Sequence, residues 1–333
     1  MHKGLLNPYL LIFTLLLFAS CAKEELPIEL PPEGDASIGV VNLGSDYRDQ
    51  IFYSFEEARI VMTSPLNSWD ISFDASPKGY YLLMNGGEEG VVYNTKQTDM
   101  KAVTTPPKIK HDQWDIDDPS GLGDSSAVGE WRDANGISKG EVYVLKFNAS
   151  FIKDTFKKIK LIAVDESSYT MEYGNLRSTE TKTIRIPKEH GFNFAYFSFS
   201  NGGTVVMPEP KKDVWDIVFT RYRYIYRNLN NFPYTVTGVL LNPSKAVAYD
   251  DSTSGFDNIK AEHINENKFT PARDVIGFDW KDYNVDQGKY TVNAKKSYLI
   301  KLDGKHYWKL HFLNYFGATG EPGTPSFEFK RLK

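Results

Sequence analysis

The chain has 333 residues and a formal net charge of -4. This length is typical of about two domains, and the charge argues against a nucleic-acid-binding protein, which usually carries a basic excess. Aromatic residues make up 14% of the sequence, a composition that favours the half-buried pleated surfaces of β-strands. The only cysteine is Cys21, which excludes intramolecular disulfides and cysteine metal clusters.

Residues 1–21 have the features of an export signal. Lys3 supplies a positive charge, and residues 9–18 form an apolar run that is too short to span a bilayer comfortably. The small residues before Cys21 resemble the bacterial lipoprotein cleavage box, in which the cysteine becomes the lipidated N-terminus. The alternative is a plain secretory signal with a chance cysteine. We expect Cys21 to carry the acyl chains of a membrane anchor.

Residues 22–35 predict a tether on the cell surface. The first four, Ala-Lys-Glu-Glu, resemble the surface-export signal of Bacteroidetes lipoproteins, a lysine followed by acidic residues. The rest contain three prolines and a glycine among acidic residues, a composition typical of a stiff, solvated linker. The expected address is the outer membrane, with the protein facing outward.

A pentapeptide at 69–73 returns with small changes at 215–219, 146 residues later. In each copy the large apolar residues alternate with others, as on one face of a β-strand. The flanks agree too, and the offset between matched positions drifts from 144 to 156, as loop insertions would cause. We therefore predict two diverged copies of one module, 36–177 and 178–333. Further matches pair 52–55 with 196–199, 90–94 with 238–242, 129–131 with 277–280, and 143–146 with 298–301.

The first module reads as a series of short antiparallel strands. Residues 95–127 interrupt the series, because they are rich in Pro, Asp, Lys, Ser and Gly. No long helical pattern occurs. The predicted strands are 38–42, 51–55, 58–62, 69–73, 80–84, 90–94, 141–147, 156–164 and 169–173.

The second module repeats this organisation, so the predicted fold class is all-β. Residues 243–272 are again irregular. Residues 221–227 alternate Arg with Tyr or Ile, which predicts either an edge strand with one wet face or a basic aromatic surface. The other predicted strands are 181–186, 194–199, 204–207, 214–219, 234–241, 275–283, 290–293, 297–302, 306–316 and 326–331.

Several of these segments resemble the HmuY family of Bacteroidetes haem-binding lipoproteins. The resemblance covers most of residues 38–332. It implies an all-β fold, an outer-membrane address and haem capture for iron acquisition, with delivery to an outer-membrane transporter. The residues that carry it are Thr181-Lys182-Thr183, 196–199, Val205-Val206, Trp215-Asp216, Gly238-Val239 and 327–329 in the second module, and 52–55, Trp69-Asp70 and 98–100 in the first.

The resemblance also implies where haem ligands should lie. One family histidine falls at Val285 in the second module and at Gly136 in the first, and neither side chain can ligate iron. The other ligand falls in the irregular stretch. Candidates there are His263 in the second module, and Met100 and His111 in the first. The alternative for each histidine is an ordinary solvated side chain.

Other chemistry finds little support in the sequence. His306 and His311 are five apart in a strand pattern and so lie on opposite faces. The acidic residues at 115–118 do not fit a calcium loop, and no zinc, phosphate-loop, dinucleotide or nucleophile-elbow motif occurs. We therefore expect no enzyme and no metal site. Two functions stay open: a surface binder of haem, or a non-haem adhesin or structural accessory that has lost the family's ligands.

Overall fold

The computed structural model describes residues 36–147, 155–286 and 288–332. The predicted signal, the tether and Cys21 lie outside the described residues. Within the described part no helix is long and apolar enough to cross a membrane.

Antiparallel strands form all of the regular structure apart from single 3-10 turns, which confirms the all-β prediction. The alternation of large apolar and small or polar side chains explains these strands, because one face of each sheet is buried. The strands are β1 Ser37–Val40, β2 Asp49–Ser54, β3 Arg59–Pro65, β4 Ile71–Asp74, β5 Leu82–Met84, β6 Val91–Asn94, β7 Val142–Lys146, β8 Phe156–Val164, β9 Ser168–Asn175, β10 Lys182–Pro187, β11 Phe194–Ser198, β12 Thr204–Val206, β13 Ile217–Tyr226, β14 Phe232–Leu241, β15 Ala246–Asp250, β16 Lys281–Asn284, β17 Lys289–Val292, β18 Ser297–Leu302, β19 His306–Phe316 and β20 Pro322–Leu332.

Short 3-10 turns stand mainly in the connections between strands. They are η2 Leu66–Ser68, η3 Gly86–Glu88, η4 His111–Gln113, η5 Gly123–Ser125, η6 Ser200–Gly202, η7 Arg227–Leu229, η8 Phe256–Asn258, η9 Ala261–His263 and η10 Glu266–Lys268.

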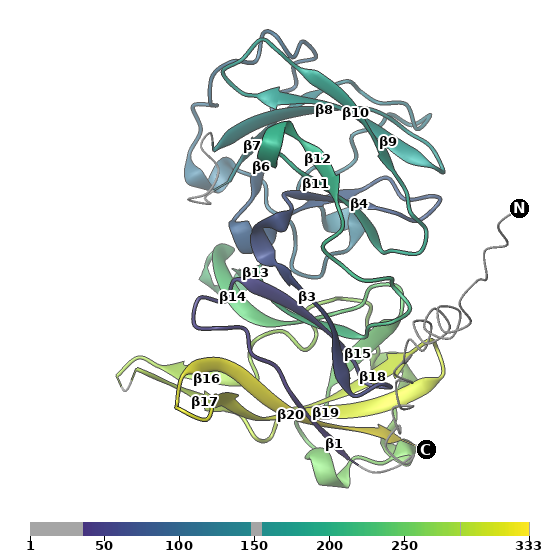
Figure 1. The fold of residues 1–333 in the computed structure, drawn as a ribbon, viewed down its shortest axis with the longest axis vertical. Coiled ribbons are helices and arrows are strands. Elements are labelled where there is room, and N and C mark those ends of the chain that lie inside the picture. Colours follow the sequence, from purple (N-terminus) through teal and green to yellow (C-terminus); the bar gives the residue numbers. More distant parts are fainter. Residues whose placement is uncertain (1–35, 148–154, 287, 333) are drawn as a thin grey trace, which may run out of the picture. The chain divides into compact units, whose positions relative to one another are not determined.

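Four sheets form two β-sandwiches (Figure 1). In the first sandwich, sheet β12-β11-β4-β5 shares a core with sheet β10-β9-β8-β7-β6. In the second, sheet β3-β2-β13-β14 shares a core with sheet β1-β20-β19-β18-β15. The strand orders correspond one to one, so the two sandwiches have the same topology. The remaining pair, β16 and β17, forms a separate hairpin.

Each sandwich takes strands from both sequence copies. Strands β1, β2 and β3 come from the first copy but lie in the second sandwich, beside β20 and β13 (Figure 1). Strands β10, β11 and β12 come from the second copy but lie in the first sandwich, beside β9 and β4. The two copies therefore exchange their first three strands. The limits 36–177 and 178–333 stay a prediction about sequence repeats, because the sheets group the strands differently.

Matching registers support the exchange. Ile71 of β4 pairs with Phe197 of β11, and the equivalent Ile217 of β13 pairs with Tyr53 of β2. A buried aspartate accompanies each pairing: Asp70 accepts a hydrogen bond from the Phe199 backbone N–H, and Asp216 accepts one from the Phe55 N–H, at 2.6 Å in both cases. Each carboxylate thus fixes a strand of the other sequence copy.

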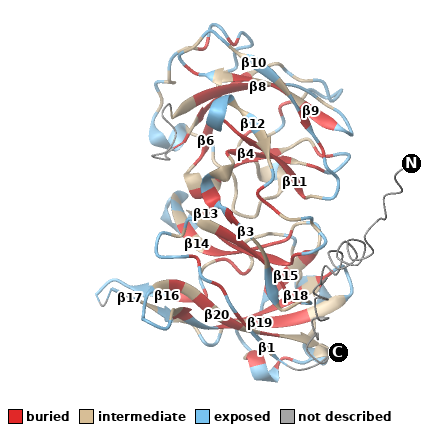
Figure 2. Cartoon of the chain, viewed as in Figure 1, coloured by how far each residue is buried: buried red, intermediate tan, exposed pale blue. Residues whose placement is uncertain are grey.

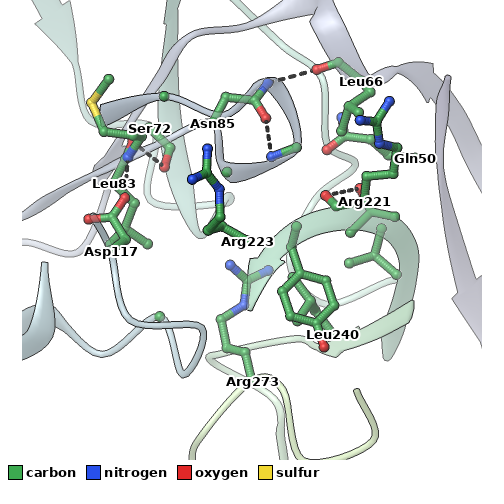
Figure 3. A pocket seen from close by; sticks show the side chains of 18 of the residues that line it. Gln50, Leu66, Ser72, Leu83, Asn85, Asp117, Arg221, Arg223, Leu240 and Arg273 are labelled. Carbon is green, nitrogen blue, oxygen red and sulfur yellow. Dashed lines mark hydrogen bonds between the residues drawn. The ribbon is translucent and has the colours of Figure 1, made fainter. Parts of the chain in front are cut away.

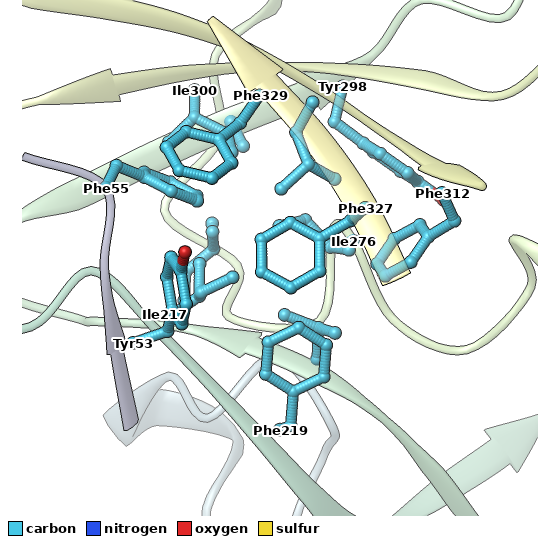
Figure 4. Close-up of a cluster of buried hydrophobic side chains, with 14 of the residues drawn as sticks. Tyr53, Phe55, Ile217, Phe219, Ile276, Tyr298, Ile300, Phe312, Phe327 and Phe329 are labelled. Carbon is cyan, nitrogen blue, oxygen red and sulfur yellow. The ribbon is translucent and has the colours of Figure 1, made fainter. Parts of the chain in front are cut away.

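The second sandwich has the larger core, with buried residues along the strands of both of its sheets (Figure 2). Aromatic rings from the two sheets meet in this core (Figure 4). Tyr53 of β2 packs edge-on against Phe327 of β20, with ring centroids 5.1 Å apart. Phe219 of β13 packs against the same ring at 5.2 Å. Strand β2 belongs to the first copy, so its burial here is part of what holds the exchanged arrangement together.

Two asparagines correct one of the predicted matches. Asn85 donates to the carbonyls of Leu66 and Trp69, and Asn242 donates to those of Lys212 and Trp215. The end of β14 therefore corresponds to the end of β5. The predicted match of 90–94 with 238–242 is wrong, since β6 corresponds instead to β15 in sheet order.

The second copy departs from prediction in two places, 246–250 and 275–280, whereas 221–226 agrees with the predicted edge strand. Residues 246–250 form β15 although 243–272 was expected to be irregular, and residues 275–280 are not a strand. In the latter, Gly277 has a φ of +58°, and its backbone pairs with Val239, so this segment crosses the sheet edge. Residues 221–226 continue β13 and pair with β14 alone.

Buried lysines hold both irregular segments in place. Lys158 on β8 donates to the carbonyls of Met100 and Val103 at 2.6 and 2.8 Å. The equivalent Lys309 on β19 donates to those of Phe256 and Ile259. Each ammonium satisfies carbonyls that have no strand partner, and this explains how segments without regular structure keep a defined path.

The two repeated tryptophans occupy equivalent positions but differ in burial. Trp215 is fully buried, whereas Trp69 is partly exposed and donates from Nε1 to Gln50. The equivalent asparagine contacts place the two tryptophans at matching positions of the repeat. Trp69 is less buried than Trp215, because it lies at the edge of a cavity.

Candidate functional site

A cavity of about 100 Å³ lies between the outer faces of β4, β5 and β11 in the first sandwich and of β2, β13 and β14 in the second. Both outer faces are apolar. Leu83, Phe194 and Tyr196 cluster on the first, and Phe52 and Leu240 are part of the cluster on the second. We call this space the inter-sandwich cavity.

Polar contacts join the two sandwiches around the cavity. Trp69 donates to Gln50, and Asn193 donates to the side-chain oxygen of Asn242 at 3.1 Å. On the other side Arg227 of η7 forms an ion pair with Asp118. The cavity is therefore bounded by contacts that involve both sandwiches.

Three arginines reach the cavity from the second sandwich (Figure 3). Arg221 and Arg223 lie two apart on β13 and so on the same face of the strand. Arg273 comes from the loop before β16, donates from Nε to the carbonyl of Leu241, and lies 5.5 Å from the ring centroid of Phe194. Figure 3 shows Arg223 and Arg273 one above the other along one side of the cavity.

Two carboxyl groups line the same cavity, and both are held by the first sandwich. Asp117 accepts hydrogen bonds from the backbone N–H groups of Met84 and Ala127. Glu209 accepts two from the backbone and one from the Tyr196 hydroxyl. Burial raises the pKa of each to about 7, against the opposing effect of these hydrogen bonds. Both groups are therefore close to half-protonated at neutral pH.

These two pKa values predict a pH-dependent stability. The unfolded pKa values are 3.8 and 4.5, so the folded protein holds protons that the unfolded chain has already released. The stabilisation is complete below the unfolded pKa and is lost as the pH rises through 7. Relative to wild type, we expect the free energy of unfolding of the Asp117→Asn/Glu209→Gln variant to rise with pH between 4.5 and 7. The slope should reach up to about 1.4 kcal/mol per pH unit for each group.

Urea denaturation at several pH values measures that difference. A difference between variant and wild type that stays constant from pH 4.5 to 7 would show that neither carboxyl group has a raised pKa.

A second cavity, of about 280 Å³, lies in the first sandwich at the β9–β10 edge. Lys157, Tyr173 and Phe199 line it. In the second sandwich Trp308 stands in the place of Lys157 and packs on Phe55, with ring centroids 5.6 Å apart. The second copy thus places a large ring where the first has a lysine. Lys157 is already bonded to Asn175 at 2.6 Å, so this cavity offers fewer unsatisfied groups than the inter-sandwich cavity.

The comparison with known families is decisive. The sequence profile described as HmuY protein matches residues 46–186 and 192–329, which together are more than half of the chain. The chain belongs to the HmuY family. The two matches also agree with a duplicated HmuY sequence. No curated protein matches the chain.

Three solved structures are similar to this HmuY-family chain. A putative HmuY-like heme-binding protein from Bacteroides vulgatus is 12% identical, with 92% of this chain and 97% of that one covered and a TM-score of 0.25. Apo PinO from Porphyromonas gingivitis is 10% identical, with 90% and 98% covered and a TM-score of 0.26. The apo HmuY analog of Tannerella forsythia is 16% identical, with 53% and 96% covered and a TM-score of 0.26.

The structure places one of the three predicted haem ligands in a core cluster and the other two at the surface. Met100 is buried, 3% exposed, in a cluster with Val103 and Leu176. His111 is exposed on η4 in the first sequence copy. His263 is exposed on η9 in the second copy, and its Nδ1 accepts a hydrogen bond from the Lys260 N–H. As ligands they stay predictions.

The positions that align with the family histidine are also surface positions. Val285 follows β16 and is 81% exposed. Gly136 is an exposed turn residue with a φ of +77°. Among the described residues, no group of three His, Cys, Asp or Glu side chains could hold a metal ion.

The cavity residues were largely missed by sequence reasoning. The alternation at 221–227 did signal one basic face, and Arg221 and Arg223 are part of it. The other cavity residues, Asp117, Glu209 and Arg273, come from loops. Arg273 and the Phe194 ring that it contacts are more than 60 residues apart in the sequence. No local pattern indicates that such residues meet.

Proposed function

We propose that this HmuY-family chain is a non-enzymatic, lipid-anchored ligand-binding protein of the outer membrane. It holds its ligand in the inter-sandwich cavity and passes it to an outer-membrane transporter. The observation that carries this proposal is the cavity itself, where charged groups from separate chain segments converge between apolar walls. Such convergence is typical of ligand sites. An adhesin or structural accessory, in contrast, has no need of an internal cavity with unpaired charged groups.

The proposed anchor depends on Cys21. Replacing Cys21 by alanine removes the only thiol that can be acylated, so we expect the variant to leave the membrane fraction and appear in the soluble fraction. Fractionation and immunoblotting of cells that express wild type or Cys21→Ala measure this. A variant that still partitions wholly with membranes would rule out lipidation as the anchor.

Haem is the second candidate ligand. The observation in its favour is that His111 and His263 are both exposed, so an imidazole is available to iron. Capture by a single imidazole leaves the other axial position of the iron open, which gives weak and exchangeable binding. Met100 does not offer its sulfur, because it is packed in a core cluster.

Alanine variants assign the donor in that case. We expect His111→Ala or His263→Ala to reduce any response to hemin, whereas Met100→Ala should leave it unchanged. Hemin titration of each purified variant beside wild type makes the comparison. A loss of binding in Met100→Ala alone, with the fold intact by circular dichroism, would reverse the assignment.

A further inference from the structure

Three arginines line the inter-sandwich cavity, and none of them forms an ion pair with a residue that the structure describes. We propose that it binds a compact oxyanion, a phosphate or the carboxylate of a small organic acid, through Arg221, Arg223 and Arg273. This proposal rests on the proposed function, since it names the chemical class of the ligand for the same cavity.

None of the three guanidinium groups forms an ion pair with a residue that the structure describes. Glu88 and Glu89 interact with Arg221 and Arg223 through longer-range charge. The Nε atom of Arg223 is buried without a hydrogen-bond partner among the described residues. A guanidinium offers five N–H donors in a planar fork that suits carboxylate and phosphate. Leaving such donors unpaired in a partly buried place is costly, so a bound oxyanion would supply what the chain does not.

The acidic groups of the cavity form their hydrogen bonds with partners other than the three arginines, although Arg273 acts on Glu209 through its charge. Asp117 and Glu209 point their oxygens at backbone N–H groups of the first sandwich. Asp118 is paired with Arg227. Burial raises the pKa of Asp117 and Glu209 to about 7, so at neutral pH each carries only part of its negative charge. These carboxylates therefore leave most of the guanidinium N–H donors of the three arginines available to an anion.

The size of the cavity limits the ligand. A volume of about 100 Å³ holds roughly three waters, given about 30 Å³ for each. That suits a phosphate or a small carboxylate and is well below the roughly 300–1,000 Å³ of pockets for drug-sized ligands. A tetrapyrrole does not fit inside it. Apolar side chains such as Leu83 and Leu240 form the remaining wall.

The arginines on β13 belong to an extension of one copy only. Strand β4 ends at Asp74, whereas its counterpart β13 continues to Tyr226. The same 146-residue offset places Ala75 and Pro77 opposite Arg221 and Arg223. The repeated fold forms without these arginines in the first copy, so they are not needed to build it.

The turn η3 packs closely against this extension of β13. A Cβ atom at Gly87 would lie 2.8 Å from the Arg221 carbonyl oxygen, and one at Gly86 would lie 3.0 Å from the Arg223 backbone nitrogen. The backbone that carries both arginines is thereby fixed by the first sandwich. A preorganised site of this kind loses little entropy on binding.

Calorimetry of the purified mature chain with inorganic phosphate and with acetate tests the proposal, with chloride at matched ionic strength as the reference. We expect one saturable site for at least one of the two oxyanions and a rise in melting temperature on binding. Arg221→Gln and Arg223→Gln should each weaken binding by about tenfold or more. The control Arg48→Gln removes an exposed arginine that is paired with Asp46 and should bind as wild type does.

The two titrations also identify the chemical class of the anion. Saturation by phosphate alone assigns a phosphate ligand, and saturation by acetate alone assigns a carboxylate. Binding that is equal in wild type and in both cavity variants would overturn the proposal, because the anion would then sit elsewhere. If neither oxyanion binds but hemin stabilises the protein, this inference is wrong, and the second candidate function, haem binding outside the cavity, remains. If the protein responds to none of the three, both proposals are wrong.

Discussion

A fragment of residues 66–212 is expected to fold alone, whereas a fragment of residues 36–177 is not. The first fragment contains β4 to β12, which are all the strands of the first sandwich. It also keeps both sides of the core in which Phe73 meets Tyr169, with ring centroids 5.0 Å apart. Its β-sheet ladders are therefore complete, and no exposed inner edge is left unpaired.

The second fragment follows the sequence repeat and loses this completeness. It lacks β10, β11 and β12, so β9 and β4 each lose a neighbouring strand. The Asp70 carboxylate also loses the hydrogen bond that it accepts from the Phe199 N–H. The fragment carries β1, β2 and β3 without the strands they pair with. Because a domain is typically stabilised by only about 5–15 kcal/mol, we expect the loss of two ladders and half of a sheet to prevent stable folding.

Circular dichroism and urea denaturation of the two purified fragments measure this difference. We expect a cooperative unfolding transition for 66–212 and none for 36–177. The opposite result would mean that the strands are not exchanged between the copies and that each sequence repeat folds on its own.

Removal of Trp215 is expected to cost about 3–5 kcal/mol of stability, the range for a large buried aromatic side chain. Trp215 has no exposed surface, and its ring meets Phe52 edge-on at 5.0 Å. Phe52 lies on an exchanged strand, so this contact joins the two sequence copies. Trp69 is partly exposed and contacts Tyr196 in the same way at 5.0 Å.

The two tryptophans form a matched pair for this experiment. Because less of Trp69 is removed from water, Trp69→Ala should cost less than Trp215→Ala, in proportion to the apolar area each buries. Urea denaturation of both variants gives the two free energies. Equal losses would contradict the difference in burial between the two sites.

The strands were predictable, but their assignment to sandwiches was not. Residues 52–55 and 196–199 have nearly the same sequence, Phe-Tyr-Ser-Phe and Tyr-Phe-Ser-Phe. Either segment presents the same faces to the strand that follows Trp69 or Trp215. Local side-chain pattern therefore cannot decide which partner each takes, and the exchange depends on how the connections run through space.

Mistakes in the second copy have a similar cause. Ala246–Asp250 forms β15 although it stands among Pro, Ser, Lys and Asp residues, because the adjacent β18 offers it a complete ladder. Residues 275–280 are apolar enough to resemble a strand, yet Ile276 and Trp280 enter the core from a turn at Gly277. Tertiary packing overrides the local pattern in both places.

The candidate site was the least predictable part. Met100 has a donor sulfur and lies in the irregular segment, so the sequence made it one of three candidate ligands. The structure places its side chain in a core cluster, and its backbone carbonyl accepts a hydrogen bond from Lys158. The arginines of β13 were visible as a basic face, but their convergence with Arg273 depends on a contact between distant segments.

Titration of the purified protein with hemin, followed by absorption spectroscopy, tests most directly whether two side chains of this chain coordinate haem iron. We expect no saturable Soret band of six-coordinate, low-spin haem, because Met100 is buried, Val285 cannot ligate iron, and His111 and His263 are held on separate turns. A stoichiometric six-coordinate spectrum that is lost in His263→Ala or His111→Ala would contradict this and would place haem, rather than a compact oxyanion, at the centre of the function.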